Sequence, residues 1–324
     1  MPATRILVTG ALGQIGRVLI DHLLALEPGA DLLATDLREP PRETPLPCAF
    51  ARLDATDGAA WQRLREQRDF DEVYHLVAVL SATGERDPWW AWDLNMRSWR
   101  HVLESAAVWP ACRVFFPSSI AAYGPPLPAS VDESQTLHPT TVYGISKAAG
   151  EQWARYAYPK FGVDVRSLRL PGVIGYQTMP GGGTTDYAVD IFHRAVAGEP
   201  YTCFLAAGTR LPMIYMDDVL RGITELTRTP RQVLAEARPP HGDPVYNLAG
   251  FSVTPAELAR AIREHVPNFA IDYAPDDRQA IAESWPERLD GTRAADDWGW
   301  QPRYDLTATT REMIAHLSPA NAPA

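Results

Sequence analysis

The sequence predicts an α/β protein with a doubly wound, open parallel sheet and a second, smaller domain. Three observations support this prediction. A short apolar run at residues 5–9 ends in a glycine-rich turn that opens an amphipathic helical pattern. Further apolar runs then alternate with helical patterns as far as about residue 172, and the alternation is lost beyond that point. Strands that alternate with helices indicate βαβ units and therefore a parallel sheet.

Composition limits the classes of function. A chain of 324 residues is long enough for about two domains. Its 30 Lys and Arg against 40 Asp and Glu give a formal net charge of −10, which argues against a nucleic-acid surface. Cys48, Cys112 and Cys203 are odd in number and lack metal-ligand spacing, and no apolar run is long enough for a membrane span. We therefore expect a cytoplasmic protein that binds no metal, membrane or nucleic acid.

The first helical pattern begins in a glycine triplet. A strand expected at Arg5–Thr9 leads into a turn with the spacing G-x-x-G-x-x-G, and apolar residues then recur at helical spacing. Strand, glycine-rich turn and helix is the arrangement of a Rossmann dinucleotide fingerprint, in which the phosphates lie on the helix N-terminus. The expected cofactor contacts in this turn are Gly10, Gly13, Gln14, Ile15 and Gly16.

The expected second strand, Asp31–Asp36, ends in an acid about 20 residues beyond the glycine triplet. A carboxylate at that place bonds the adenosine ribose hydroxyls and repels a 2′-phosphate, so NAD is favoured over NADP. Leu37 and Arg38 adjoin the same site. Arg38 weakens the preference because an arginine can accommodate the phosphate, and a turn role remains the alternative for Asp36.

A third strand is expected at 49–54 and a fourth at 71–78. The residues near their carboxyl ends are expected to meet the cofactor: Asp54, Ala55, Leu76 and Ala78. Asp54 has a turn role as its alternative, and Asp57 is expected to cap the helix that follows. Ser81 follows in a loop expected at 79–84, at the sheet edge where open α/β folds bind ligands, although a plain loop serine is equally consistent.

A helix expected at 89–108 carries four tryptophans, which are more typical of a core or a subunit interface than of a cofactor site. Asn95 is a polar residue within this apolar pattern. We expect it to tie the helix to the cofactor loop.

Ser119, Tyr143 and Lys147 are the candidate catalytic residues. Ser119 follows a fifth strand expected to stop at Pro117, and the other two stand four apart on a helix expected to reach about residue 161. Tyrosine and lysine at this spacing project from one helix face, where an ammonium would lower the phenol pKa from its usual value near 10. Such a pair can transfer protons. An ordinary helix is the alternative for the pair alone, but its occurrence after a nucleotide loop and a strand-end serine favours an active site.

The pattern changes after a sixth strand, which is expected at 162–170. A glycine-rich stretch at 180–185 suits a ligand loop. The expected elements that follow are a helix from Asp186 to 197, a strand at 211–216, a helix capped by Asp217 or Asp218, a loop or frayed helix at 229–243, a strand at 244–249, and a capping box at Thr254 and Glu257. The expected division is 1–172 with 216–244 for the nucleotide domain, 173–215 with 245–317 for a discontinuous substrate domain, and a disordered tail at 318–324.

These motifs resemble the extended short-chain dehydrogenase/reductase family. Its Ser-x-x-x-Tyr-Gly element matches Ser119 to Gly124, so Ser119 and not Ser118 inherits the catalytic role. Within the family the chain is similar to the short-chain type of L-threonine 3-dehydrogenase, from Arg5 to about Leu306. The matching stretches are PSSIA at 117–121, TVYGISK at 141–147, GGGTTDYA at 181–188, LPMIYMDD at 211–218 and SWP at 284–286.

The resemblance implies NAD-dependent oxidation of the threonine hydroxyl to 2-amino-3-oxobutyrate, an activity of threonine catabolism. It implies that Tyr143 is the base, that Lys147 lowers its pKa and bonds the nicotinamide ribose, that Ser119 holds the hydroxyl, and that Val173 backs the nicotinamide. The implied substrate contacts are Ser81, Ser119, Tyr143, Gly183, Thr184, Thr185 and Trp285. It also implies a homodimer formed by the helices at 89–108 and 141–161, unless their apolar faces pack internally.

Two other functions remain open. A nucleotide-sugar epimerase or dehydratase of the same fold commonly carries Arg-Asp, whose arginine helps to hold the nucleotide, where this chain has Leu211 and Pro212. These two residues cannot bond a diphosphate, but the neighbouring Arg210 leaves this function as an alternative. A non-catalytic NAD-sensing protein would be expected to lack the tyrosine or the lysine, and both are present.

Overall fold

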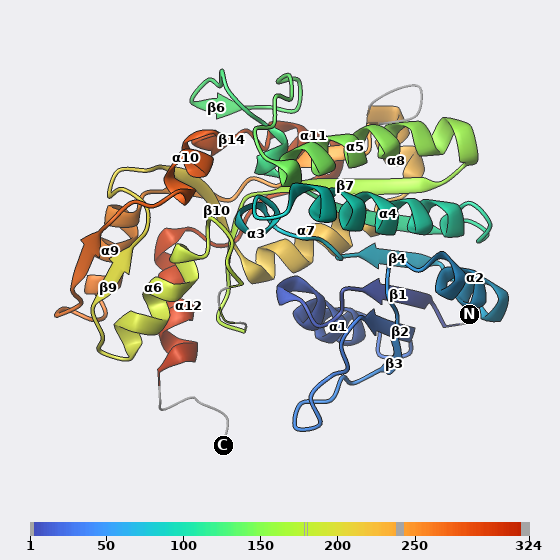
Figure 1. Ribbon diagram of the computed structural model, residues 1–324, viewed down its shortest axis with the longest axis horizontal. Coiled ribbons are helices and arrows are strands. Elements are labelled where there is room, and N and C mark those ends of the chain that lie inside the picture. Colours follow the sequence, from blue (N-terminus) through green and yellow to red (C-terminus); the bar gives the residue numbers. More distant parts are fainter. Residues whose placement is uncertain (1–2, 178, 180, 238–242, 319–324) are drawn as a thin grey trace.

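A parallel sheet of seven strands forms the centre of the protein. The computed structural model describes residues 3–177, 179, 181–237 and 243–318. The strand order is β11-β7-β5-β4-β1-β2-β3 (Figure 1). The strands are β1 (Arg5–Thr9), β2 (Asp31–Asp36), β3 (Ala49–Arg52), β4 (Glu72–His75), β5 (Arg113–Ser119), β7 (Asp164–Leu170) and β11 (Val245–Asn247). From β1 the chain adds β2 and β3 towards one edge of the sheet, and from β4 onward it adds strands towards the other edge. Open parallel sheets bind ligands at such a switch between β1 and β4, beyond the carboxyl ends of the strands.

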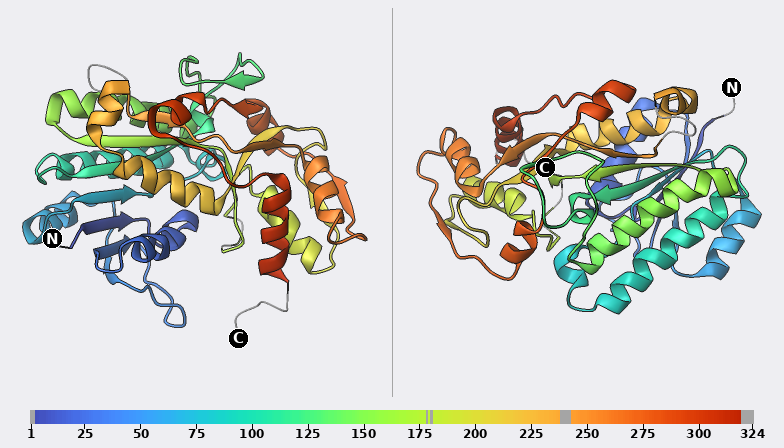
Figure 2. Two further views of the ribbon diagram at one scale, coloured as in Figure 1. Left: turned by 180° about the vertical axis from the view of Figure 1, so that it is seen from behind. Right: turned by 90° about the horizontal axis from the view of Figure 1, so that it is seen from above.

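Helices cover both faces of this sheet, which confirms the predicted fold class (Figure 2). In β1, Leu7 points to one face, while Ile6 and Val8 point to the other. The Leu7 face packs against α2 (Gly58–Gln67), α4 (Pro88–Ala106) and α5 (Val142–Phe161). The opposite face packs against α1 (Gln14–Leu26), α7 (Met216–Arg228), α8 (Arg231–Ala237) and α11 (Thr292–Trp298). No described helix is both long and apolar enough to cross a membrane.

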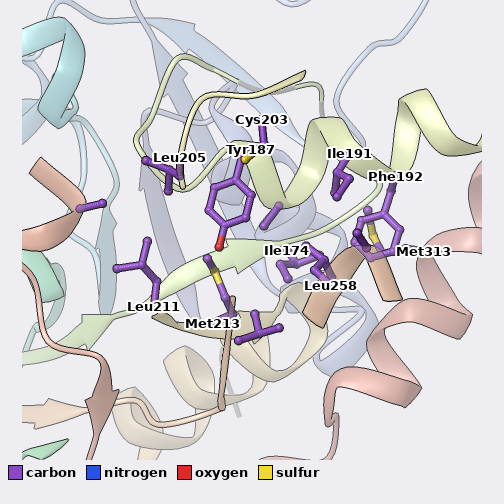
Figure 3. Packing of buried hydrophobic residues seen from close by; sticks show 14 of the residues in the cluster. Ile174, Tyr187, Ile191, Phe192, Cys203, Leu205, Leu211, Met213, Leu258 and Met313 are labelled. Atoms are coloured by element: carbon purple, nitrogen blue, oxygen red, sulfur yellow. The ribbon is translucent and has the colours of Figure 1, made fainter. Parts of the chain in front are cut away.

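A second body of short strands and helices stands beside the carboxyl ends of the sheet (Figure 1). It contains a sheet in the order β12-β10-β8 and a pair β13-β9. In its core, Tyr187, Ile191 and Phe192 of α6 pack among Met213 and the labelled residues of neighbouring segments (Figure 3). Its elements are β8 (Gly172–Ile174), α6 (Tyr187–Val196), β9 (Tyr201–Cys203), β10 (Leu211–Tyr215), β12 (Phe251–Val253), α9 (Pro255–Arg263), β13 (Ile271–Tyr273), α10 (Arg278–Glu283) and α12 (Leu306–Leu317).

One expected domain boundary is wrong. β11, which was expected in the smaller domain, pairs in parallel with β7 and is the edge strand of the main sheet. Residues from 292 to 300 also pack on the main sheet, through Ala294 and Trp300. We therefore propose a division in which 245–248 and 292–300 belong to the nucleotide domain. The expected tail lies outside the described residues from 319 onward.

Several expected element boundaries also differ from the structure. β5 continues through Pro117 to Ser119, because beyond Phe115 the strand is paired only with β7, and a position with one open side tolerates proline. α7 begins at Met216, so neither Asp217 nor Asp218 caps it. The Asp218 carboxylate instead accepts hydrogen bonds from the backbone amides of residues 303 and 304. A short helix, α3 (Ser81–Gly84), occupies the expected loop, and the strands expected at 49–54, 71–78, 162–170 and 244–249 are shorter than expected.

Other local signals are confirmed. Asp57 accepts hydrogen bonds from the first amides of α2, and Thr254 and Glu257 form the expected capping box at α9. Short paired strands, β6 (Ser130–Val131) and β14 (Arg288–Leu289), join the segment after β5 to the smaller domain.

A buried ion pair joins α5 to the sheet. Glu151 and Arg169 have fully buried side chains, and two hydrogen bonds of 2.8 and 2.7 Å link them. Ser118 donates to the same carboxylate at 2.5 Å. Arg169 also donates to the Tyr123 hydroxyl at 2.6 Å, which in turn donates to Asn247 on β11 at 2.8 Å. One network therefore connects α5 with three strands of the main sheet.

We expect Arg169→Met to lower the free energy of unfolding by about 3–5 kcal/mol, because the buried Glu151 carboxylate loses both hydrogen bonds from Arg169 and keeps only the longer contact with Arg155 at 3.6 Å among its described ion pairs. Urea denaturation would measure this loss. The double variant Glu151→Leu/Arg169→Met should recover most of it, since an apolar pair replaces the ion pair. Arg194→Ala, which removes an exposed pair with Glu199 on the smaller domain, should change the free energy by less than about 1 kcal/mol. An equal effect of Arg169→Met and Arg194→Ala would contradict the expected role of the buried pair.

Candidate active site

One cavity lies beyond the carboxyl ends of β1, β4 and β5, between the sheet and the smaller domain. Most of the predicted site residues line it, and they come from both domains. The predicted residues in its wall are Gly10, Gly13, Gln14, Ile15, Gly16, Leu76, Ala78, Ser81, Ser119, Tyr143, Lys147, Val173, Gly183, Thr184, Thr185 and Trp285. The predicted residues outside its wall are Asp36, Leu37, Arg38, Asp54, Ala55 and Asn95.

The glycine-rich turn has the close backbone approach that a bound pyrophosphate requires. Gly10 has a φ of +70°, and a Cβ there would lie 2.9 Å from the backbone carbonyl carbon of Leu76. A Cβ on Gly16 would lie 2.4 Å from the Gly10 oxygen. Any larger residue at either place would push the turn away from β4 or from α1. The first turn of α1 faces the cavity, where unpaired helix amides and the helix dipole favour an anion.

Asp36 lies next to this turn, at the end of β2. Its carboxylate accepts hydrogen bonds from the backbone amides of Leu12 at 3.0 Å and Arg38 at 3.1 Å. The Arg38 guanidinium is 3.5 Å from the same carboxylate, and its side chain is 70% exposed. Asp54 instead accepts two hydrogen bonds from Thr56, the arrangement of the turn alternative. The glycine turn, the helix N-terminus and the acid after β2 together fit a dinucleotide.

Ser119, Tyr143 and Lys147 converge in the cavity wall. Thr141 caps α5 through the Gly144 amide, which places Tyr143 in the first turn of the helix and Lys147 one turn later. The Lys147 Nζ lies 5.4 Å from the centre of the Tyr143 ring and 4.8 Å from that of Phe116. The predicted tyrosine–lysine pair is therefore present on one helix face.

The expected fall in the tyrosine pKa does not occur in the protein alone. Burial raises the pKa of Tyr143 to about 12, and a hydrogen bond with the Ser119 side chain offsets only part of this effect. Burial also lowers the pKa of Lys147 to about 7, against the opposing influence of the Glu151 charge. Desolvation is the largest influence on both groups, with the Lys147 side chain buried and Tyr143 half-buried. A phenolate at this place needs positive charge beyond that of Lys147.

The neighbours of these residues are held by hydrogen bonds. Ser118 donates to Glu151, so of the two adjacent serines Ser119 is the one whose hydroxyl meets Tyr143. Asn95 ties α4 to the cofactor loop, as expected: its side-chain oxygen accepts from the Val79 amide at 2.8 Å, and its side-chain nitrogen donates to Ser146 on α5 at 3.1 Å. The strand-end loop and α5 are thus fixed relative to each other.

The glycine-threonine loop forms the opposite wall. The Thr184 hydroxyl lies 3.2 Å from the Ser81 hydroxyl, and both residues are buried. Asp186 shapes this loop, because its carboxylate accepts hydrogen bonds of 2.7 Å from the amides of both Gly181 and Gly183. Asp186 also lines the cavity, although sequence analysis assigned it only to a helix start. Its place directly after two loop threonines was the signal that could have identified it.

Few charges face this cavity. Among the described residues of its wall, only Lys147 and Asp186 carry charged side chains. Arg210, the residue that kept a nucleotide-sugar function open, lies outside the wall and is paired with Glu257 at 2.7 Å. No group of three or more His, Cys, Asp or Glu side chains in the described part of the chain is placed to hold a metal ion.

Comparisons with known proteins identify the family of the chain. The model of the NAD-dependent epimerase/dehydratase family matches residues 6–249. An uncharacterised epimerase/dehydratase of Staphylococcus haemolyticus is 41% identical over 313 residues, which cover 96% of each chain.

Similar solved structures confirm the resemblance to L-threonine 3-dehydrogenases. One is a GalE-like L-threonine dehydrogenase from Cupriavidus necator in its holo form, with 48% identity, a TM-score of 0.91, and coverage of 97% of this chain and 100% of that one. Another, from metagenome sequences, is described as a monomeric L-threonine 3-dehydrogenase, with 39% identity, a TM-score of 0.91, and coverage of 98% and 99%. The cofactor is NAD, and the chain belongs to the NAD-dependent epimerase/dehydratase family, within the extended short-chain dehydrogenases/reductases.

Proposed function

We propose that this protein oxidises the C3 hydroxyl of L-threonine with NAD to give 2-amino-3-oxobutyrate. The observation that carries the proposal is the cavity that Ser119, Tyr143 and Lys147 share with the buried hydroxyls of Ser81 and Thr184 and the carboxylate of Asp186. The catalytic side suits an alcohol, and the opposite side suits the charged groups of a small amino acid. The similarity to solved L-threonine dehydrogenases supports this assignment.

The protein holds the cofactor through its nucleotide domain. The turn from Gly10 to Gly16 receives the pyrophosphate, Asp36 bonds the adenosine ribose, and Val173 on β8 backs the nicotinamide. Bound NAD supplies the hydride acceptor, and its positive ring favours a nearby phenolate. Leu37, Arg38, Ala55, Leu76, Ala78 and Asn95 complete the proposed contacts or support them, whereas the Asp54 carboxylate keeps the turn role that its bonds to Thr56 indicate.

The chain's own residues then handle the hydroxyl proton. Ser119 donates a hydrogen bond that holds the substrate oxygen beside Tyr143. The Tyr143 phenolate removes the proton from that oxygen, and Lys147 stabilises the phenolate by its charge and its bond to the nicotinamide ribose. The network through Ser118 and Glu151 keeps Ser119 and the tyrosine helix in register.

The opposite wall binds the rest of the amino acid. Ser81, Thr184 and Thr185 donate to the substrate carboxylate, and Gly183 lines the wall beside them. Asp186 lies on the same wall and pairs with the ammonium, since it is the one carboxylate among the described lining residues. Trp285 closes the cavity on the side of the smaller domain.

The family description keeps a nucleotide-sugar epimerase or dehydratase as the second candidate. NADH formation on a panel of 3-hydroxy amino acids and UDP-sugars separates the two. We expect turnover of L-threonine and none of the sugars. Turnover of a UDP-sugar without threonine would replace this proposal, and NAD binding without any turnover would favour a sensing protein.

We expect Tyr143→Phe to lower kcat for threonine by at least about 100-fold, because it removes the group that accepts the proton. Fluorescence titration should show that NADH still binds. In the unaltered protein, kcat/KM should rise with pH between 7 and 10, since burial holds the tyrosine pKa high and only its ionised form is active. Lys147→Met should move this rise to higher pH. A flat pH profile or an active Tyr143→Phe variant would contradict the assigned base.

We expect Asp36→Asn to weaken NAD binding about tenfold and to weaken NADP binding less, because a charged hydrogen bond to the ribose is lost while repulsion of the 2′-phosphate is relieved. Fluorescence titration with NADH and NADPH measures both affinities. Asp54→Asn is the matched control and should leave both affinities unchanged. Among the described hydrogen bonds, the Asp54 carboxylate accepts only from the Thr56 amide and hydroxyl. Equal changes for both cofactors in Asp36→Asn would remove it from the ribose site.

We also propose that the protein forms a homodimer through α4 and α5. Trp153 and Phe161 are 44% and 46% exposed, and with Trp92, Met96 and Leu103 they line an apolar hollow on the outer side of these helices. Large apolar patches of this kind mark protein interfaces.

We expect Trp153→Glu to give a monomer in sedimentation velocity, because the burial of a carboxylate in an apolar interface is unfavourable. Val233→Glu, an equally exposed apolar position on α8, should leave the assembly unchanged. One similar L-threonine 3-dehydrogenase is described as monomeric, so a monomer in the unaltered protein is the result that would refute the dimer.

A further inference from the structure

Trp285 forms a wall between two hollows. It is the only described residue that lines both the catalytic cavity and a second, outer groove of about 650 Å³. The outer groove is lined in part by Leu127, Ala129, Ala206 and Ala282, which present apolar side chains. Trp285 itself is 8% exposed, so its side chain fills the space between the two hollows.

The segment that carries Trp285 is anchored on both sides. The Ser284 hydroxyl donates to the Ile281 carbonyl at 2.7 Å and accepts from Thr140 at 3.0 Å. Thr140 immediately precedes the cap of α5, the helix that carries Tyr143. A few residues further on, β14 pairs with β6. The backbone beside Trp285 is therefore anchored to the start of the helix that carries Tyr143, and the buried indole packs in the core of the smaller domain.

The chemistry of the proposed substrate places one group against this wall. The inference rests on the proposed function. The reacting C3 carbon carries a hydroxyl directed to Ser119 and Tyr143, a hydrogen directed to the cofactor, and a C2 carbon whose charged groups face Ser81, Thr184 and Asp186. Its methyl group is the one substituent left, and the indole offers it an apolar surface.

We propose that Trp285 sets the upper size limit of the C3 substituent. A smaller residue at this position joins the outer groove to the catalytic cavity, and the joined space accepts 3-hydroxy amino acids with a large apolar C3 group. The apolar side chains of Leu127, Ala129 and Ala206 then contact that group.

The test compares L-threonine with L-threo-3-phenylserine as substrates, with NADH formation as the readout. Trp285→Ala should raise the ratio of kcat/KM for phenylserine to that for threonine at least tenfold over the unaltered protein, as one contact of this size is worth about 10–200-fold. Trp285→Leu should give a smaller increase in the same direction. Calorimetric binding of phenylserine to the NADH complex should improve in parallel. NADH affinity, which reports folding, should stay within about twofold.

Ala129→Trp provides the matched control, because it refills the outer groove without touching the catalytic cavity. In the Trp285→Ala background it should abolish the gain for phenylserine. An unchanged ratio in both Trp285 variants, or efficient phenylserine turnover by the unaltered protein, would overturn this inference and leave the proposed function intact. Failure of the unaltered protein to oxidise threonine would overturn the proposed function and this inference with it.

Discussion

The buried Glu151–Arg169 ion pair is the interaction on which the catalytic geometry depends. Ser118 on β5 lies opposite Arg169 on β7 in the sheet register, and the Glu151 carboxylate of α5 bonds both. Glu151 stands one turn beyond Lys147 on that helix. These directed bonds, together with the close packing of Gly150 on Phe116, hold the end of β5 and the tyrosine–lysine face of α5 at a fixed spacing. A buried ion pair adds little net stability compared with an apolar pair, but its bond directions fix position.

The same enclosure that fixes these residues also opposes their charge. Burial raises the pKa of Tyr143 and lowers that of Lys147, so desolvation favours the neutral form of each. A neutral phenol cannot act as a base, which means that the free protein is poorly prepared for the chemistry. Positive charge brought in with the cofactor acts in a site of low polarity, where it has a large effect on the phenol. In the proposed mechanism, burial thus makes proton abstraction by Tyr143 depend on the positive charge of the bound cofactor.

Sequence predicted well the parts of the fold whose signals are local. The run from β1 through the glycine turn to α1, the caps at Asp57 and Thr254, and the helix of Tyr143 and Lys147 each depend on neighbouring residues in the chain. Prediction failed where a distant partner decides the outcome. Pro117 does not end β5, because at this position the strand is paired with β7 on one side only, and the proline needs no hydrogen bond on the other side.

Pairing with distant segments also explains several short strands that the sequence did not predict. β6, β9, β13 and β14 contain two or three residues each and exist only through pairing with distant segments. Asp186 was assigned to a helix start, yet its carboxylate shapes the substrate loop. This role of Asp186 depends on how the loop folds against the cavity, and a local sequence pattern does not predict that fold.

The balance of charge in the cavity is the physical argument for a small zwitterionic substrate. A nucleotide sugar carries two negative charges on its diphosphate, and its burial requires cations that compensate them. The described wall offers one cation, Lys147, which is already engaged with the tyrosine, and one anion, Asp186. Arg210, the arginine that kept a nucleotide-sugar function open, is paired with Glu257 and lines the outer groove on the other side of Trp285. An amino acid brings one charge of each sign, so hydroxyl and amide donors can meet its carboxylate while Asp186 meets its ammonium. The walls of the cavity therefore match the charge of an amino acid and leave a diphosphate without its counter-charges.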